Sequence, residues 1–395
     1  MLLEDKVLEI RKDFPILEKK HKNKPFIYFD SACMSLKPKQ VIEKMLEYYK
    51  EYTACHGRSV HDFSEKTTEE FENVRRKVAK MIGAREDEII FTKNTTESIN
   101  FVANFFRGKK VITTDLEHNS NFIPWKKMSG KHTIIHVDEK TGFDFETFEK
   151  EVKDADLVSV VHYSNFSGHI LPVKEIIKIA HKNGVKVLLD CAQSAPHVEI
   201  NVRDLGADFI AFSGHKMLGP TGVGVLYGKI NLLKDFEGMM FGGETVKNVD
   251  KNKIEWEDIP HKFEAGLQNY GGIIGFGAAI DYLLKLGWKN IENYESKLVK
   301  ELVEGCEKLG LRYVGPKERP ALISIVPKTL SAHELALLLN EENIFVRSGM
   351  HCVHYYHNEV LKVAGTVRAS LYFYNTFEEI HNFYKVLEKI QKTFI

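Results

Sequence analysis

Short runs rich in Val, Ile and Leu alternate with helical stretches between residues 88 and 227, and this alternation constrains the fold more than any other feature. Such runs, when helices separate them, are typical of a mostly parallel sheet that is covered on both faces. We therefore expect an α/β fold built on a large sheet. The expected strands cover residues 88–92, 110–114, 133–137, 156–162, 185–190, 208–212 and 223–227.

The pattern changes after a long helical stretch that ends at Gly287. We expect a large α/β domain over residues 21–287. A smaller α+β domain would comprise residues 288–395 together with the N-terminal arm, residues 1–20. The elements expected in its C-terminal part are a helix, a strand at 321–326, a helix at 332–340, strands at 344–347 and 367–372, and a final helix.

Composition argues against several classes of protein. The 395 residues carry 55 basic and 55 acidic side chains without a block of like charge, so we expect no nucleic acid and no membrane as partners. No apolar run approaches the length of a transmembrane helix, and the acidic N-terminus is unlike a signal peptide. Five scattered cysteines without a CxxC pair indicate a reducing, cytoplasmic setting and no metal site.

A single lysine follows the expected strand at 208–212. Lys216 precedes three closely spaced glycines, Gly219, Gly222 and Gly224. Burial disfavours the charged form of lysine, and a neutral amine is a good nucleophile toward an aldehyde. The alternative is an exposed lysine in a glycine-rich turn, and this stretch alone leaves both readings open.

Two further features fall at strand ends, where ligands bind to parallel sheets. Asp190 ends the strand at 185–190, and Thr95 and Thr96 open a helix after the strand at 88–92. We expect one of these threonines to cap that helix, whose N-terminus could hold a phosphate. Each residue could be an ordinary cap, but an acid, a phosphate cradle and a reactive lysine together indicate pyridoxal 5'-phosphate (PLP).

Five motifs carry a resemblance to a known family. They closely resemble the class V aminotransferase-like, fold-type I PLP enzymes, in matching order from about Tyr28 to Asn382. The fold implied is a large, mostly parallel sheet domain with a smaller α+β C-terminal domain. The motifs are Thr95-Thr-Glu-Ser-Ile-Asn100, Glu117-His-Asn-Ser-Asn121, Leu189-Asp-Cys-Ala-Gln-Ser194, the glycine-rich stretch from Ser213 to Gly224, and Phe263-Glu-Ala-Gly266.

The resemblance implies roles around the cofactor. Lys216 would form the Schiff base, Asp190 would pair with the ring nitrogen, and Gln193 would bond the ring hydroxyl. His118 would stack on the ring and help move protons. The residues that would hold the phosphate are Thr95, Thr96, Ser213 and His215.

Within the family, residues 347–352 and 367–375 resemble the SUF-type (group II) cysteine desulfurases. Asn165, Arg347 and Arg368 would then bind the substrate carboxylate, and Cys352 would be the nucleophile. A lone cysteine could instead be a small buried apolar residue. Arg347 and His351 are our candidates for lowering the pKa of the thiol.

The implied reaction converts L-cysteine to L-alanine, with Lys216 as general base and a persulfide left on Cys352. A homodimer would pass this sulfur to an acceptor or iron–sulfur scaffold protein, for iron–sulfur cluster assembly. Selenocysteine lyase, transaminase and kynureninase-like chemistry share the Lys216 core and stay open. A non-catalytic scaffold subunit is a further alternative.

The sequence departs from the family pattern at three places. Met350 replaces the first histidine of a His-His pair, and residues 353–357 lack the usual Ala-x-Pro. Leu267 stands where the family usually has a threonine that reaches a phosphate across the dimer interface, so Gln268 could take that contact. The departures at Met350 and at residues 353–357 leave the sulfur acceptor open.

Overall fold

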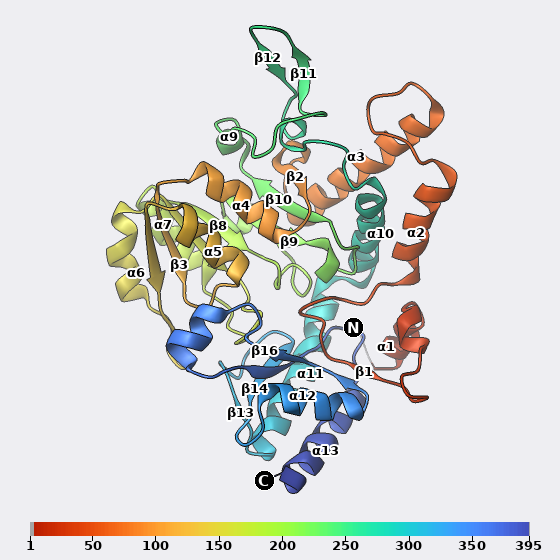
Figure 1. The fold of residues 1–395 in the computed structure, drawn as a ribbon, viewed down its shortest axis with the longest axis vertical. Coiled ribbons are helices and arrows are strands. Elements are labelled where there is room, and N and C mark those ends of the chain that lie inside the picture. The colour runs from red at the N-terminus through yellow and green to blue at the C-terminus, as the bar shows by residue number, and fades with distance from the viewer. Residues whose placement is uncertain (1–3, 395) are drawn as a thin grey trace.

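Seven strands form the central sheet, in the order β2-β10-β9-β8-β7-β3-β4 (Figure 1). The computed structural model describes residues 4–394. Five neighbouring strands, β9 to β4, are parallel, whereas β10 runs antiparallel to β2 and β9. The mostly parallel sheet is thereby confirmed. The strands are β2 (Ile89–Thr92), β3 (Lys110–Thr114), β4 (Lys131–Ile135), β7 (Leu157–Val161), β8 (Lys186–Asp190), β9 (Phe209–Ser213) and β10 (Gly224–Gly228).

Helices cover both faces of this sheet. Along β8, Leu188 belongs to the cluster under α4 and α5, whereas Val187 and Leu189 belong to the main core on the other face. Because successive side chains of a strand point to opposite faces, a continuous apolar run fits a strand that is buried on both sides. The helices of this unit are α2 (Lys39–Glu51), α3 (Asp62–Ile82), α4 (Thr95–Phe105), α5 (Asn119–Met128), α6 (Phe145–Glu151), α7 (Val173–Lys182), α8 (Val202–Leu205), α9 (Ile230–Leu233) and α10 (Tyr270–Leu286).

The C-terminal part folds around a second, four-stranded sheet, in the order β13-β14-β17-β16. Its strand pairs are antiparallel, as an α+β unit requires. Its strands are β13 (Arg312–Tyr313), β14 (Leu322–Val326), β16 (Arg347–Gly349) and β17 (Thr366–Ser370), and its helices are α11 (Trp288–Lys308), α12 (Ala332–Glu341) and α13 (Phe377–Phe394).

One expected strand, at 344–347, is two strands. β15 (Ile344–Phe345) pairs in parallel with β1 (Ile27–Tyr28), whereas β16 pairs with β17. The prediction of a single strand was wrong because the two ends of this segment hydrogen-bond to different partner strands. The domain boundary at residue 21 stays a prediction, although β1, which it assigns to the large domain, pairs with the C-terminal unit.

The N-terminal arm, helix α1 (Glu4–Arg11), contacts the C-terminal unit. Arg11 forms an ion pair with Glu379 at 2.9 Å. Phe14 packs its ring against that of Tyr374, with centroids 5.0 Å apart. These contacts agree with the expected packing of the arm.

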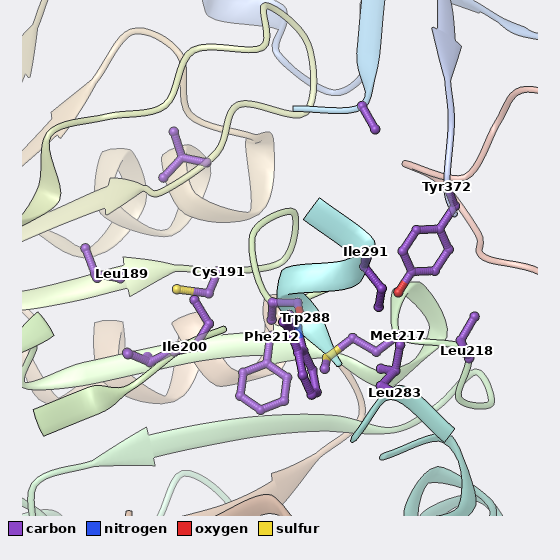
Figure 2. Packing of buried hydrophobic residues seen from close by; sticks show 14 of the residues in the cluster. Leu189, Cys191, Ile200, Phe212, Met217, Leu218, Leu283, Trp288, Ile291 and Tyr372 are labelled. Carbon is purple, nitrogen blue, oxygen red and sulfur yellow. The ribbon is translucent and has the colours of Figure 1, made fainter. Parts of the chain in front are cut away.

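The start of α11 joins the two units (Figure 2). Trp288 and Ile291 of this helix lie between the large sheet, near Phe212, and Tyr372 of the C-terminal unit. The Trp288 indole N–H donates to the Ala195 carbonyl at 3.1 Å, and the Tyr372 hydroxyl donates to the Pro196 carbonyl at 2.9 Å. Both acceptors follow β8, so the C-terminal unit is fixed against the carboxyl end of a central strand.

A hairpin of β11 (Val246–Val249) and β12 (Ile254–Trp256) projects from the body of the molecule (Figure 1). The sequence pattern predicted only a loosely ordered, charged segment here. Two short outer strands are β5 (Val137–Asp138) and β6 (Gly142–Phe143). Within residues 4–394, none of the helices has the length and apolar character needed to cross a membrane.

Candidate active site

A cavity at the carboxyl ends of β8 and β9 extends toward β16 and β17 of the C-terminal unit. The two units therefore both contribute to its walls. Every residue that the sequence suggested for cofactor or carboxylate binding lines this cavity: Thr95, Thr96, His118, Asn165, Asp190, Gln193, Ser213, His215, Lys216, Arg347 and Arg368.

Lys216 stands in the short turn after β9, in the segment Gly214–Lys216. Its burial lowers the pKa of the amine, although the carboxylate of Asp190 acts in the opposite direction. A lowered pKa increases the share of neutral amine near pH 7, and that form can attack a carbonyl or accept a proton. The lysine thus has the environment that a nucleophile or general base requires.

Asp190 ends β8 at the wall of the cavity and is 3 % exposed. Its carboxylate accepts a hydrogen bond from the Ala192 amide at 2.9 Å, and burial raises its pKa. It forms no ion pair with any side chain in residues 4–394. A buried carboxylate without an ion-pair partner favours a ligand that brings a positive N–H group.

The N-terminus of α4 lies at another wall. Asn94 caps this helix, because its side-chain oxygen accepts from the Glu97 amide at 3.0 Å. The prediction of a Thr95 or Thr96 cap was therefore wrong. The hydroxyl of Thr95 instead contacts that of Ser213 at 2.7 Å, and Thr96 contacts Ser120 at 2.7 Å. Hydroxyls beside a positive helix end suit a phosphate.

His118 caps helix α5 and remains neutral. Its Nδ1 accepts from the Ser120 amide at 3.1 Å, which leaves the ring proton on Nε2. Burial, followed by the charge of Lys216, lowers the pKa of His118 to about 3. Gln193 donates its side-chain N–H to the Ala32 carbonyl at 2.7 Å. Its amide oxygen is then oriented as an acceptor.

Two arginines face each other across the C-terminal sheet. Arg347 on β16 is the register partner of Arg368 on β17. Arg368 is 1 % exposed and donates to Asp30 at 3.0 Å and to the Asn165 carbonyl at 2.9 Å, whereas its Nε has no partner. Arg347 forms no ion pair within residues 4–394. Like charges directly opposite each other are destabilising, so this pair favours a bound anion.

Cys352 lies on the loop after β16, beside the cavity rather than among the residues that line it. Its Sγ is 4.0 Å from Nη2 of Arg347. The Asn119 amide donates to the Cys352 carbonyl at 2.6 Å. Both His351 and Cys352 have positive φ, +49° and +61°, which turns the chain sharply at the thiol.

His351 does not provide the positive charge that we expected from it. Burial, followed by the charge of Arg368, lowers its pKa to about 2, so the ring is neutral. Its Nε2 contacts the hydroxyl of Thr366 at 2.9 Å. Of the two candidates, Arg347 is the one that carries positive charge beside the thiol.

Sequence reasoning missed several residues that line the cavity. Asn94, Ser120 and Ala192 are neighbours of predicted residues, so position along the motifs could have found them. Cys33 and Ala32 had no such signal, because β1 brings their segment to the site through pairing with a strand more than 300 residues away. The missed residues are Ala32, Cys33, Asn94, Ser120, Val161 and Ala192.

Leu267 is 68 % exposed, and Gln268 donates its side-chain N–H to the Gly266 carbonyl at 3.2 Å. The side chain of Gln268 is therefore engaged within its own turn. A contact of either residue with a second subunit stays a prediction.

Comparisons with known proteins agree with this geometry. Residues 27–383 match the family model Aminotransferase class-V. A probable cysteine desulfurase of Pyrococcus abyssi is 41 % identical, over 98 % of this chain and 98 % of its own. Another, of Synechocystis sp., is 41 % identical over 96 % of this chain and 94 % of its own.

Solved structures are similar as well. The apo structure of a cysteine desulfurase from Thermococcus onnurineus NA1 superposes with a TM-score of 0.93 at 40 % identity, covering 100 % of this chain and 99 % of that one. A cysteine desulfurase from Escherichia coli gives 0.90 at 29 % identity, covering 98 % and 99 %. The chain therefore belongs to the aminotransferase class-V family and has the fold-type I architecture.

Proposed function

We propose that this protein is a PLP-dependent cysteine desulfurase, which removes sulfur from L-cysteine and leaves L-alanine. The observation that carries the proposal is one site that combines a buried lysine, a buried carboxylate without an ion-pair partner and a thiol beside an arginine. The relatives with about 40 % identity along the whole chain support the same activity.

The residues of the cavity fit PLP. Asp190 would accept a hydrogen bond from the protonated ring nitrogen, and Gln193 would hydrogen-bond the ring hydroxyl. His118 would cover the ring. The hydroxyls of Thr95 and Ser213, with Thr96 and His215, would hold the phosphate at the N-terminus of α4. When bound, PLP supplies an electron sink for the negative charge that develops at the substrate Cα.

The paired arginines suit an amino-acid carboxylate. The Arg368 Nε without a partner and the free charge of Arg347 border the same cavity, whereas the side-chain N–H of Asn165 donates to the His351 carbonyl at 2.8 Å. A carboxylate there would relieve the repulsion between the guanidinium groups and would be held by charge-assisted bonds. The substrate would then be held between the lysine and the thiol.

Lys216 would move protons. Its amine, whose pKa burial lowers, would in its neutral form take the proton from the substrate Cα. The proton would later return to the carbon skeleton as alanine forms. His118, with its proton on Nε2, would donate a hydrogen bond into the site without carrying charge.

Cys352 would receive the sulfur. Its thiolate attacks the substrate sulfur, so an S–S bond forms, the substrate C–S bond breaks, and Cβ takes up a proton. L-cysteine and the enzyme thiol are thereby converted to L-alanine and an enzyme persulfide. Arg347 stabilises the thiolate that this attack requires.

A second copy of the chain and a sulfur acceptor would complete the system. Exposed apolar side chains gather near the projecting hairpin, among them Phe241 at 62 %, Trp256 at 39 % and Leu267 at 68 %. A homodimer would cover such a surface. The persulfide would pass to a thiol of an acceptor or iron–sulfur scaffold protein, in the cytoplasm.

The activity is tested by incubating the PLP-loaded protein with L-cysteine and a thiol reductant, and measuring alanine and sulfide together. We expect equal amounts, and no alanine from the Lys216→Ala variant. Pyruvate or another keto acid as the main product would contradict the proposal and would favour a different lyase or a transaminase.

A further inference from the structure

Three donors converge on one backbone carbonyl beside Lys216. The His215 carbonyl, which belongs to the peptide bond that leads into Lys216, accepts from the Ser35 amide at 3.1 Å, the Ser35 hydroxyl at 3.0 Å and the Lys37 ammonium at 2.8 Å. A carbonyl oxygen has two lone pairs, so three donors saturate it. The donors come from the segment between β1 and α2, about 180 residues earlier in the chain.

The same segment holds the other side of the lysine. The Leu218 amide donates to the Ser35 hydroxyl at 2.9 Å. Leu218 has φ +64°, a strained conformation that residues other than glycine rarely adopt. The backbone is therefore fixed both one bond before Lys216 and two residues after it.

Lys37 has no carboxylate for a partner. Its ammonium donates to the Ser35 carbonyl at 2.6 Å, to the Ser35 hydroxyl at 3.2 Å and to the His215 carbonyl, and it forms no ion pair within residues 4–394. Burial lowers its pKa to about 7. Burying an ammonium group that bonds only to neutral oxygens carries a desolvation penalty that lowers the stability of the fold. A neutral side chain in the same place would avoid this penalty, so stability alone does not explain Lys37.

We infer that Ser35 and Lys37 are positioning residues, which hold the turn around Lys216 so that its amine reaches the reacting carbon of the cofactor and the substrate. The inference rests on the proposed function, because it assigns Lys216 to that chemistry. Neither side chain is among those that line the cavity. A misplacement of about 1 Å in a reacting group can cost about a hundredfold in rate, so the hydrogen bonds act on catalysis through geometry.

The test uses the full-length protein with Lys37→Met and Ser35→Ala, and Lys39→Met as the matched control. Lys39 lies two residues away, and its ion pair with Asp13 at 3.2 Å is on the surface. Apoprotein is mixed with PLP, and the rate at which the yellow absorbance of lysine-bound cofactor develops is followed. Borohydride reduction and mass spectrometry then confirm Lys216 as the attachment point.

We expect both test variants to capture PLP about tenfold more slowly or worse, and kcat to fall by a similar factor. KM for L-cysteine should stay within about twofold, because the two arginines are untouched, and Lys39→Met should match the wild type. Capture rates and kcat within about twofold of the wild type in both variants would overturn the inference.

Folding is checked by thermal melting of each apoprotein. A variant that melts like the wild type but captures PLP slowly supports positioning, whereas two variants that do not fold would count against it and assign the residues to stability. Wild-type protein that captures PLP on Lys216 but makes no alanine would contradict the proposed function, while the comparison of capture rates would still decide the inference.

Discussion

The amide of Asn119 donates a hydrogen bond to the carbonyl of Cys352 at 2.6 Å. Asn119 is the first residue of α5 and directly follows His118, whose ring would cover the cofactor. This hydrogen bond therefore links the backbone next to His118 to Cys352, which would take the sulfur. The side chain of Asn119 adds a second tie, to Nδ1 of His354 at 2.9 Å. The loop that carries the thiol is thus attached to the wall of the cofactor cavity.

Replacing Asn119 by proline should cut this tie without breaking the helix. Proline is favoured at the first helical position, and the ψ of 145° at the preceding His118 suits it. The loss of one hydrogen bond is worth about 1 kcal/mol, so we expect kcat to fall about fivefold to tenfold, with PLP affinity unchanged. Asn119→Ala, which keeps the amide, is the control. Equal kcat in the two variants would show that the tie does not matter.

Arg347 should contribute mainly to substrate binding. Charge-assisted hydrogen bonds contribute about 1.5–3 kcal/mol, so Arg347→Met should lower kcat/KM for L-cysteine by about tenfold to a hundredfold. Steady-state kinetics with L-cysteine and with its methyl ester separates the causes, because the ester lacks the anionic carboxylate. An equal loss for both substrates would contradict carboxylate binding by Arg347.

Acid should destabilise the protein through its buried histidines. Burial lowers the pKa of His162 to about 4 from a usual value of 6.5. Below pH 6.5 the unfolded chain therefore takes up protons that the folded protein does not, and the free energy of unfolding falls as the pH drops from about 6.5 toward 4. Scanning calorimetry should give a lower Tm at pH 5 than at pH 7.5, with a smaller drop for His162→Gln. The same drop in both proteins would contradict this origin.

The exposed apolar residues predict a homodimer. Light scattering coupled to size-exclusion chromatography should give a mass about twice the chain mass of 45.3 kDa. Glutamate at Phe241 and Trp256 should shift the mass toward the monomer, because charge in an apolar interface opposes association. Glutamate at Leu8, exposed on α1, serves as the control. A monomeric wild type would contradict the homodimer.

The central sheet was predictable because its strands carry continuous apolar runs, which burial on both faces demands. Asp190 and Lys216 could be placed at one rim because the carboxyl ends of parallel strands share an edge. The sequence had no comparable signal for the pairing of β1 with β15. A strand of two residues is too short to show an alternating pattern, and the two strands lie far apart in the chain. That pairing brings Ala32 and Cys33 to the site.

The chemistry of single groups was harder to predict than their location. The sequence shows a histidine before Cys352, but only the structure shows that its ring is buried against Thr366 and near the charge of Arg368, and is therefore uncharged. Similarly, the Ser35 and Lys37 contacts with the His215 carbonyl depend on a loop whose course no local pattern determines.

The most direct test of the account is the fate of sulfur after one turnover. The PLP-loaded protein is mixed with L-cysteine without reductant, then alkylated and digested. The mass of the peptide that contains Cys352 is measured by mass spectrometry. Cys352→Ala and Cys55→Ala are the comparison variants. We predict one added sulfur atom on Cys352, together with alanine, in the wild type and in Cys55→Ala, and no alanine from Cys352→Ala. Alanine formed at the wild-type rate by Cys352→Ala, or a wild-type Cys352 peptide without added sulfur, would contradict the account.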